Sequence, residues 1–139
     1  MQSQHAEASL NEVRLAVLRQ HTQLAQLLDE LEQHANAAIA CTGSFVDEAR
    51  PLNEALGLLL ARFSRHLDYE ETQLAPWLTA QNRGTLLSDH DDQRRRALGL
   101  VHDRDVFGDP RTLARAALAF VHALRKDMAD EEAQLRAVR

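Results

Sequence analysis

Imidazole and carboxylate side chains that could bind a metal ion interrupt four amphipathic stretches of this sequence. In each stretch apolar residues recur at spacings of three and four, as on an α-helix with one buried face, but polar residues occupy some of the apolar positions. The interrupting residues are His21, His66 with Glu70, His90, and Asp127 with Glu131. Imidazoles and carboxylates without a thiolate suit iron, manganese or zinc. The pattern therefore predicts a metal site inside a helical bundle.

Two of the interruptions are pairs of residues separated by four positions. Such residues lie about 40° apart around a helix and about 6 Å apart along it, so His66 with Glu70, and Asp127 with Glu131, each point towards one place. The segments 63–74 and 124–135 also share one pattern of apolar, ligand-type and paired glutamate positions. This internal repeat favours a centre with two metal ions.

Three carboxylates directed into a core need a compensating positive charge. An unpaired buried charge costs several kcal/mol, and two divalent cations would balance the carboxylates. Arg94, which lies on the expected stripe of His90, is the alternative source of positive charge.

Four helices are expected to position these residues in an all-α fold. The first should run from residues 9–11 to about residue 40, the second from Pro51 to between Pro76 and Gly84, the third from about Thr85, and the fourth from Pro110 nearly to Arg139. On the third helix the expected stripe is Leu87, His90, Arg94, Leu98 and Val101. Short connections favour an up-down-up-down four-helix bundle, in one domain over residues 1–139. In that bundle the interruptions fall within about one helical turn of a common depth.

Composition and charge exclude several other classes of protein. The net charge of -5 argues against a nucleic-acid-binding protein. No apolar run approaches the roughly 20 residues that span a bilayer, so no membrane association is expected. Cys41 is the only cysteine, and the polar segment 1–12 lacks the regions of a signal peptide, which predicts a cytoplasmic protein.

Four segments resemble the hemerythrin-like, HHE cation-binding family, and together the resemblance spans essentially the whole chain. They are LRQHTQLAQLLDELE around His21, HLDYEETQLAPWL with the HxxxEE pattern, SDHDDQRRRALGL around His90, and DMADEEAQL. The resemblance implies a hemerythrin-like bundle in which His21, His66, Glu70, His90 and Glu131 are metal ligands. It places Asp127 at a histidine position as a substituted ligand, and it implies that Glu70 and Glu131 bridge the metal ions or nearly do so.

The chain departs from this pattern at two places. Oxygen-carrying hemerythrins have a second histidine on the third helix where this chain has Arg94. They also have an HxxxxD pattern on the fourth helix, which His122 and Asp127 match in a second register. We favour Asp127 with Glu131, because His122 lies about 200° around the helix from its apolar stripe. His5, His34 and His102 are expected at the surface, and core packing is expected for Tyr69 and Trp77.

The resemblance leads us to expect a cytoplasmic non-haem di-iron protein, with zinc or manganese as alternative metals. It would bind, sense or react with dioxygen or a related diatomic or peroxide species, or handle iron. The alternative is a degenerate, metal-free bundle that acts as an interaction or regulatory module, in which Arg94 pairs with Asp127 or Glu131. No catalytic residue is assigned, although oxygen or peroxide chemistry at the metal is compatible with the ligands. A protein partner or a homo-oligomer is compatible with either hypothesis.

Overall fold

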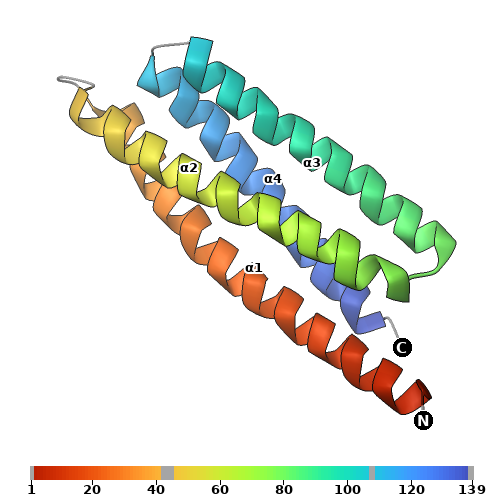
Figure 1. Cartoon of the computed structure of the whole chain (residues 1–139). Coiled ribbons are helices and arrows are strands. Elements are labelled where there is room, and N and C mark those ends of the chain that lie inside the picture. The colour runs from red at the N-terminus through yellow and green to blue at the C-terminus, as the bar shows by residue number, and fades with distance from the viewer. Residues whose placement is uncertain (1, 42–45, 107–108, 138–139) are drawn as a thin grey trace.

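The computed structural model describes residues 2–41, 46–106 and 109–137, and nearly all of them are helical. The elements in chain order are α1 (Gln2–Ala40), α2 (Val46–Tyr69), a π-helical turn η1 (Glu70–Leu74), a 3-10 turn η2 (Ala75–Trp77), α3 (Ala80–Val106) and α4 (Pro110–Ala137). Each of the long helices α1 to α4 runs antiparallel to the next one along the chain, so α1 begins and α4 ends at the same end of the bundle (Figure 1). The expected all-α four-helix bundle is therefore confirmed.

The apolar stripes of α1, α2 and α4 form the main core. Leucines of α1 and α2 and small or aromatic residues of α4 are almost completely buried there, as the three and four spacing predicts. They include Leu24, Leu28, Leu31, Leu52, Leu56, Leu59, Ala117, Phe120 and Leu124. The rings of Phe63 and Phe120 meet edge to face, with centroids 5.9 Å apart. Burial of this apolar surface holds the helices in place relative to one another. The polar residues that interrupt the stripes are thereby kept at a fixed depth in the bundle.

The buried face of α3 differs from the expected stripe. Leu87 and Leu98 are exposed, with 39% and 68% of their surface accessible, whereas Leu86 and Leu100 are buried. Leucines occur on both candidate faces of this helix, so spacing alone does not select one of them. His90 lies on both stripes, and its burial was therefore predicted despite the wrong register. The α3 helix also packs less extensively against α2 and α4 than α1 does.

One helix begins at a side-chain cap, and three helices begin at other residues than expected. The carboxylate of Asp109 caps α4 by accepting hydrogen bonds from the Arg111 backbone N–H and the Thr112 hydroxyl. The α1, α2 and α3 helices begin earlier than expected, at Gln2, Val46 and Ala80. Consequently Gly84 lies inside α3 instead of between two helices, and a Cβ atom added there would meet no other atom within 4 Å.

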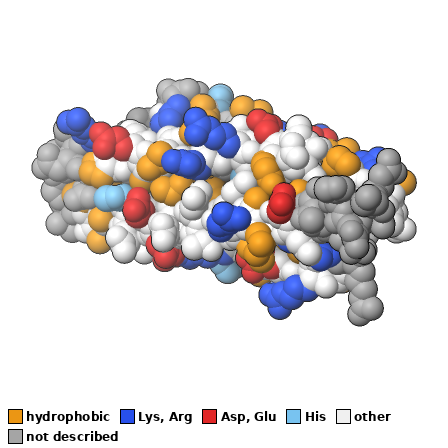
Figure 2. Space-filling view, turned by 60° about the horizontal axis from the view of Figure 1, so that its bottom comes forward, with side chains coloured by type: hydrophobic (Ala, Val, Ile, Leu, Met, Phe, Trp, Pro, Cys, Tyr) orange, Lys and Arg blue, Asp and Glu red, His pale blue; other side chains and the backbone are white. Residues whose placement is uncertain are grey.

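The outer surface is mixed in character. On the face in Figure 2, acidic and basic side chains alternate with small groups of hydrophobic ones. None of the helices in the described part of the chain combines the length and hydropathy of a bilayer-spanning segment.

Candidate metal centre

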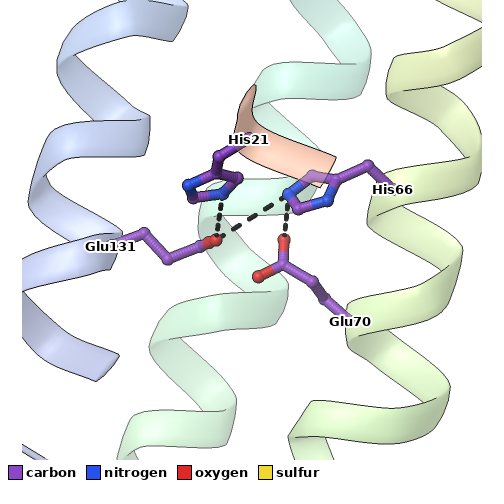
Figure 3. Close-up of side chains that lie close together, drawn as sticks. All are labelled: His21, His66, Glu70 and Glu131. Carbon is purple, nitrogen blue, oxygen red and sulfur yellow. Dashed lines mark hydrogen bonds and ion pairs between the residues drawn. The ribbon is translucent and has the colours of Figure 1, made fainter. Parts of the chain in front are cut away.

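Four of the expected ligands converge in the bundle interior. His21 comes from α1, His66 from α2, Glu70 from η1 and Glu131 from α4, and one ligand atom from each lies within 4.8 Å of the others. His21 Nε2 lies 2.8 Å from Glu131 Oε1, and His66 Nε2 lies 2.8 Å from Glu70 Oε1 (Figure 3). These elements are far apart in the sequence, so only the bundle brings their side chains together. We call this group of four side chains, together with His90, the metal centre, since it is the candidate site for a bound cation.

His90 of α3 adjoins the four residues and is as deeply buried as His21, His66 and Glu70, whereas Glu131 is partly buried. Its side chain is 1% exposed, and its Nε2 lies 3.4 Å from Glu70 Oε1. Among the described residues, neither ring nitrogen of His90 and neither carboxylate oxygen of Glu70 makes a hydrogen bond of good geometry, and Glu70 Oε1 has only its ion-pair contact with His66 and the longer one with His90. Unpartnered buried polar atoms destabilise a fold unless something else satisfies them. A cation bound between these atoms would do so, and the donor set therefore fits a metal.

Each histidine has an oxygen atom near its outer nitrogen. His66 Nδ1 lies 2.7 Å from the amide oxygen of Gln20, and His21 Nδ1 lies 3.0 Å from Glu132 Oε1. For His90 the corresponding neighbour is Glu71, at 3.7 Å. Donation of the Nδ1 proton outward leaves Nε2 directed inward, which is the usual arrangement of a metal-binding imidazole with its supporting hydrogen bond.

The sequence did not identify Gln20, Glu71 and Glu132 as supporting residues. A signal was nevertheless present, because both glutamate pairs of the internal repeat divide in the same way. The first member, Glu70 or Glu131, faces the centre. The second member, Glu71 or Glu132, faces the outer nitrogen of a histidine on a neighbouring helix.

Electrostatics couple the histidines to the carboxylates. Burial disfavours a charged imidazole, but the carboxylates of Glu131 and Glu70 outweigh burial and raise the pKa of His66 to about 9. The pKa of His21 is also raised, since Glu131 and Glu132 overcome its burial. Burial would raise the pKa of Glu131, but hydrogen bonding to His21 and His66 lowers it below its usual range. Protons on the imidazoles and a metal ion thus compete for the same carboxylates.

The structure does not bring Asp127 into the metal centre. Its side chain is 34% exposed and accepts a hydrogen bond from Gln93 Nε2 at 3.1 Å, with Arg96 at 3.6 Å. His122, the alternative residue on α4, is exposed. Asp127 therefore lies at the edge of the centre, in the groove between α3 and α4.

The metal-free hypothesis expected Arg94 to pair with Asp127 or Glu131, but Arg94 pairs with neither of them. Its guanidinium donates two hydrogen bonds to the Glu71 carboxylate, one of them 2.7 Å long, and also contacts Asp68 at 3.2 Å. This contact holds the pKa of Glu71 below its usual range, despite some burial. The register of α3 explains why Arg94 points away from Asp127 and Glu131, because Gln93 and not Arg94 faces the interior.

The other residues named from the sequence lie outside the centre. His102 is exposed and His34 is partly exposed, while the side chain of His5 lies outside the described residues. Tyr69 is partly buried and packs against a small cluster formed by Val13, Val17, Leu74 and Leu135. Trp77 is partly buried in a hollow at the end of the bundle.

A family comparison agrees with this geometry. The model of the hemerythrin HHE cation-binding domain matches residues 15–137, which include every residue of the centre. No curated protein and no solved structure matches the chain significantly.

Proposed function

Because the chain belongs to the hemerythrin HHE cation-binding family, we propose that it is a non-haem di-iron protein that binds, senses or reacts with dioxygen or a related small species. The observation that carries this proposal is the convergence of three buried ligand side chains, His21, His66 and Glu70, with the partly buried Glu131, beside the buried imidazole of His90, which makes no hydrogen bond. Zinc and manganese suit the same donors and remain the alternative metals.

The residues divide into two proposed metal positions. His21, His66, Glu70 and Glu131 would hold one ion, since they lie together. His90 would hold the second ion, and Glu70 lies next to both His66 and His90 and would bridge the two positions. Asp127 would complete the second position from α4 if its contact with Gln93 were exchanged for the metal. Bound iron would supply the electrons that dioxygen or peroxide chemistry requires.

Sensing or iron handling fits the ligands better than reversible oxygen carriage. With Arg94 bound to Glu71 and Asp68, α3 provides one imidazole to the centre. The remaining donors are rich in carboxylate oxygens, which are hard ligands and favour ferric over ferrous iron. Repeated cycles of oxygen uptake and release by the reduced protein, without oxidation, would contradict this part of the proposal.

Anaerobic iron loading tests the proposal directly. The protein would be loaded with ferrous iron, desalted, analysed for metal, and then exposed to air in an absorption spectrometer. We expect two iron ions per chain and charge-transfer bands of ferric iron that Glu70→Ala or His66→Ala abolishes. His122→Ala is the matched control, because it removes an exposed histidine from α4. Retention of zinc with no iron uptake would exclude the di-iron assignment.

A metal-free interaction module is the second candidate function, and one observation favours it. His66 Nε2 lies 2.8 Å from Glu70 and His21 Nε2 lies 2.8 Å from Glu131, so protonated imidazoles, favoured by the raised pKa of both histidines, would balance the two carboxylates without a metal. Elemental analysis after purification without chelators distinguishes the two functions. A protein free of metal, and unable to take up iron, cobalt or zinc, would support the interaction module.

A further inference from the structure

A groove between α3 and α4 leads from the surface to the metal centre. It encloses a hollow of about 200 Å³ and is bordered by both His90 and Glu131. His90 is 1% exposed, and neither of its ring nitrogens makes a hydrogen bond, although carboxylates of Glu70 and Glu71 lie 3.4 Å and 3.7 Å away. The groove therefore ends at a buried ligand whose hydrogen-bonding capacity is not used.

The groove is strongly acidic. Its lining includes Asp89 and Asp92 from α3 and Asp127, Asp130 and Glu131 from α4, against one basic residue, Arg96. Arg96 is half exposed and lies 3.6 Å from Asp127. Exposed ion pairs of this kind are weak, so an arriving cation can replace the guanidinium at Asp127. A groove lined by one sign of charge also concentrates ions of the opposite sign.

Two other hollows reach the centre, and neither suits a cation as well. One lies on the α1 and α2 side next to His66 and contains Arg62 and Arg65 without a carboxylate in its lining. The other borders Glu131 from the end of the bundle and is lined largely by apolar residues, including Leu74, Trp77 and Leu135. Positive charge in the first and low polarity in the second both disfavour passage of a divalent ion.

We propose that the α3–α4 groove is the entry route for the divalent cation. Asp89 and Asp130 attract the ion at the mouth, Asp127 forms the outer contact in place of Arg96, and His90 is the first buried ligand that the ion meets. This inference rests on the proposed metal-binding function, but it concerns the rate of loading and not the final content of metal.

Stopped-flow loading with cobalt(II) as the probe tests the route, because bound cobalt absorbs visible light. The double variant Asp89→Asn with Asp130→Asn removes two exposed carboxylates that are not ligands of the centre. Its loading should slow by about fivefold or more at low ionic strength, and the difference should shrink as salt is added. The final cobalt content should equal that of the parent.

Two further variants provide the controls. Glu12→Gln with Glu30→Gln makes the same change of charge on exposed positions of α1 and should leave the loading rate close to that of the parent. Arg96→Gln should accelerate loading, since it removes the competing cation from Asp127.

The possible results separate the route from the function. Equal loading rates for the parent and the Asp89 and Asp130 double variant would overturn the route while leaving metal binding intact. If Arg62→Gln loaded faster than the parent while Arg96→Gln loaded at the parent's rate, the α3–α4 route would be wrong. The ion would then enter through the hollow next to His66, between α1 and α2. A parent protein that takes up no cobalt at any time would overturn both the route and the proposed function.

Discussion

At the scale of single residues, two imidazoles of the centre, those of His21 and His66, are each held in a defined orientation. For His21 and His66, Nδ1 contacts an oxygen of Glu132 or Gln20, and Nε2 faces a carboxylate of the centre. Supporting contacts of this kind fix the ring and raise its basicity as a ligand. Residues that do not touch the metal should therefore contribute measurably to its affinity.

Removing the support of His21 tests this directly. In Glu132→Ala the Nδ1 proton of His21 loses its acceptor, and the affinity for cobalt(II) should fall by about 10- to 100-fold, measured by competition with a chelator of known affinity. Glu132→Gln keeps an acceptor oxygen and should recover much of the loss. Glu30→Ala, at an exposed position of α1, is the control. Equal affinities for Glu132→Ala and the parent would contradict this role of Glu132.

The raised pKa of His66 predicts how pH affects the metal-free protein. A histidine whose pKa rises from 6.5 to about 9 on folding stabilises the fold fully below about pH 6.5 and loses this contribution as pH rises through 9. Urea unfolding of the metal-free protein should therefore show a loss of up to roughly 3 kcal/mol over this range. His66→Gln should flatten the dependence, whereas His122→Gln should not change it. A parent equally stable at pH 6.5 and pH 9 would exclude a protonated His66.

Metal binding should have the opposite pH dependence. A cation must displace the Nε2 proton of His66, so its apparent affinity rises with pH until the imidazole is neutral, near pH 9. Isothermal titration with zinc or cobalt in buffers of different ionisation enthalpy would measure the proton released. No proton release at pH 7 would contradict competition between the proton and the metal at this nitrogen.

The site residues were predictable from the sequence where a single spacing fixed their direction. The HxxxE spacing on one amphipathic helix identified His66 and Glu70, and breaks in the apolar stripes identified His21 and His90. The position of Asp127 was not determined by spacing, because the rotation of α4 and the contact with Gln93 direct it to the groove. Supporting contacts between helices, such as that of Glu132 with His21, depend on tertiary packing, so the paired glutamates of the repeat could mark Glu132 but not the histidine that it contacts.

At the scale of the elements, η1 and α3 control the shape of the centre. The π-helical turn begins at Glu70, and the Thr72 hydroxyl donates to the Asp68 and Tyr69 carbonyl oxygens. Such turns inside helices occur frequently at functional sites. The α-helix itself ends at Tyr69, before the expected end between Pro76 and Gly84, and the chain continues through η1 and η2 to Trp77. The spacing around Pro76 did not predict this local widening. On α3 the sequence offered two apolar faces, and packing selected the one with Leu86 and Leu100.

A pair of leucine variants tests the register of α3. Leu100 is 4% exposed and Leu98 is 68% exposed. Leu100→Ala should lower the free energy of unfolding by about 2 to 3 kcal/mol, whereas Leu98→Ala should change it by less than about 0.5 kcal/mol. Chemical denaturation of both variants and the parent measures the difference. A larger loss of stability for Leu98→Ala than for Leu100→Ala would show instead that the face with Leu87, Arg94 and Leu98 is buried.

At the scale of the whole molecule, the metal centre connects all four helices of the bundle. One candidate ligand comes from α1, one from α3, one from α4, and two from α2 and the turn that follows it. A ligand that binds only the folded state stabilises it by an amount that grows with its concentration, about 2.7 kcal/mol at 100 times Kd. Metal should therefore stabilise the complete bundle and not one helix alone.

Thermal unfolding measures this coupling. Saturating metal should raise the Tm of the parent by several degrees, and a chelator should reverse the change. His66→Ala should remove the effect of metal while His122→Ala retains it, since only the former loses a residue of the centre. An equal rise of Tm in both variants would show that the metal stabilises the fold from another place.

Anomalous diffraction from crystals of the iron-loaded protein, collected on both sides of the iron absorption edge, tests the central claim most directly. We expect two iron peaks inside the bundle, one among His21, His66, Glu70 and Glu131 and one beside His90 and Glu70. Crystals from iron-saturated solution that show no interior iron peak, with His21 and His66 still bonded to the carboxylates, would contradict it.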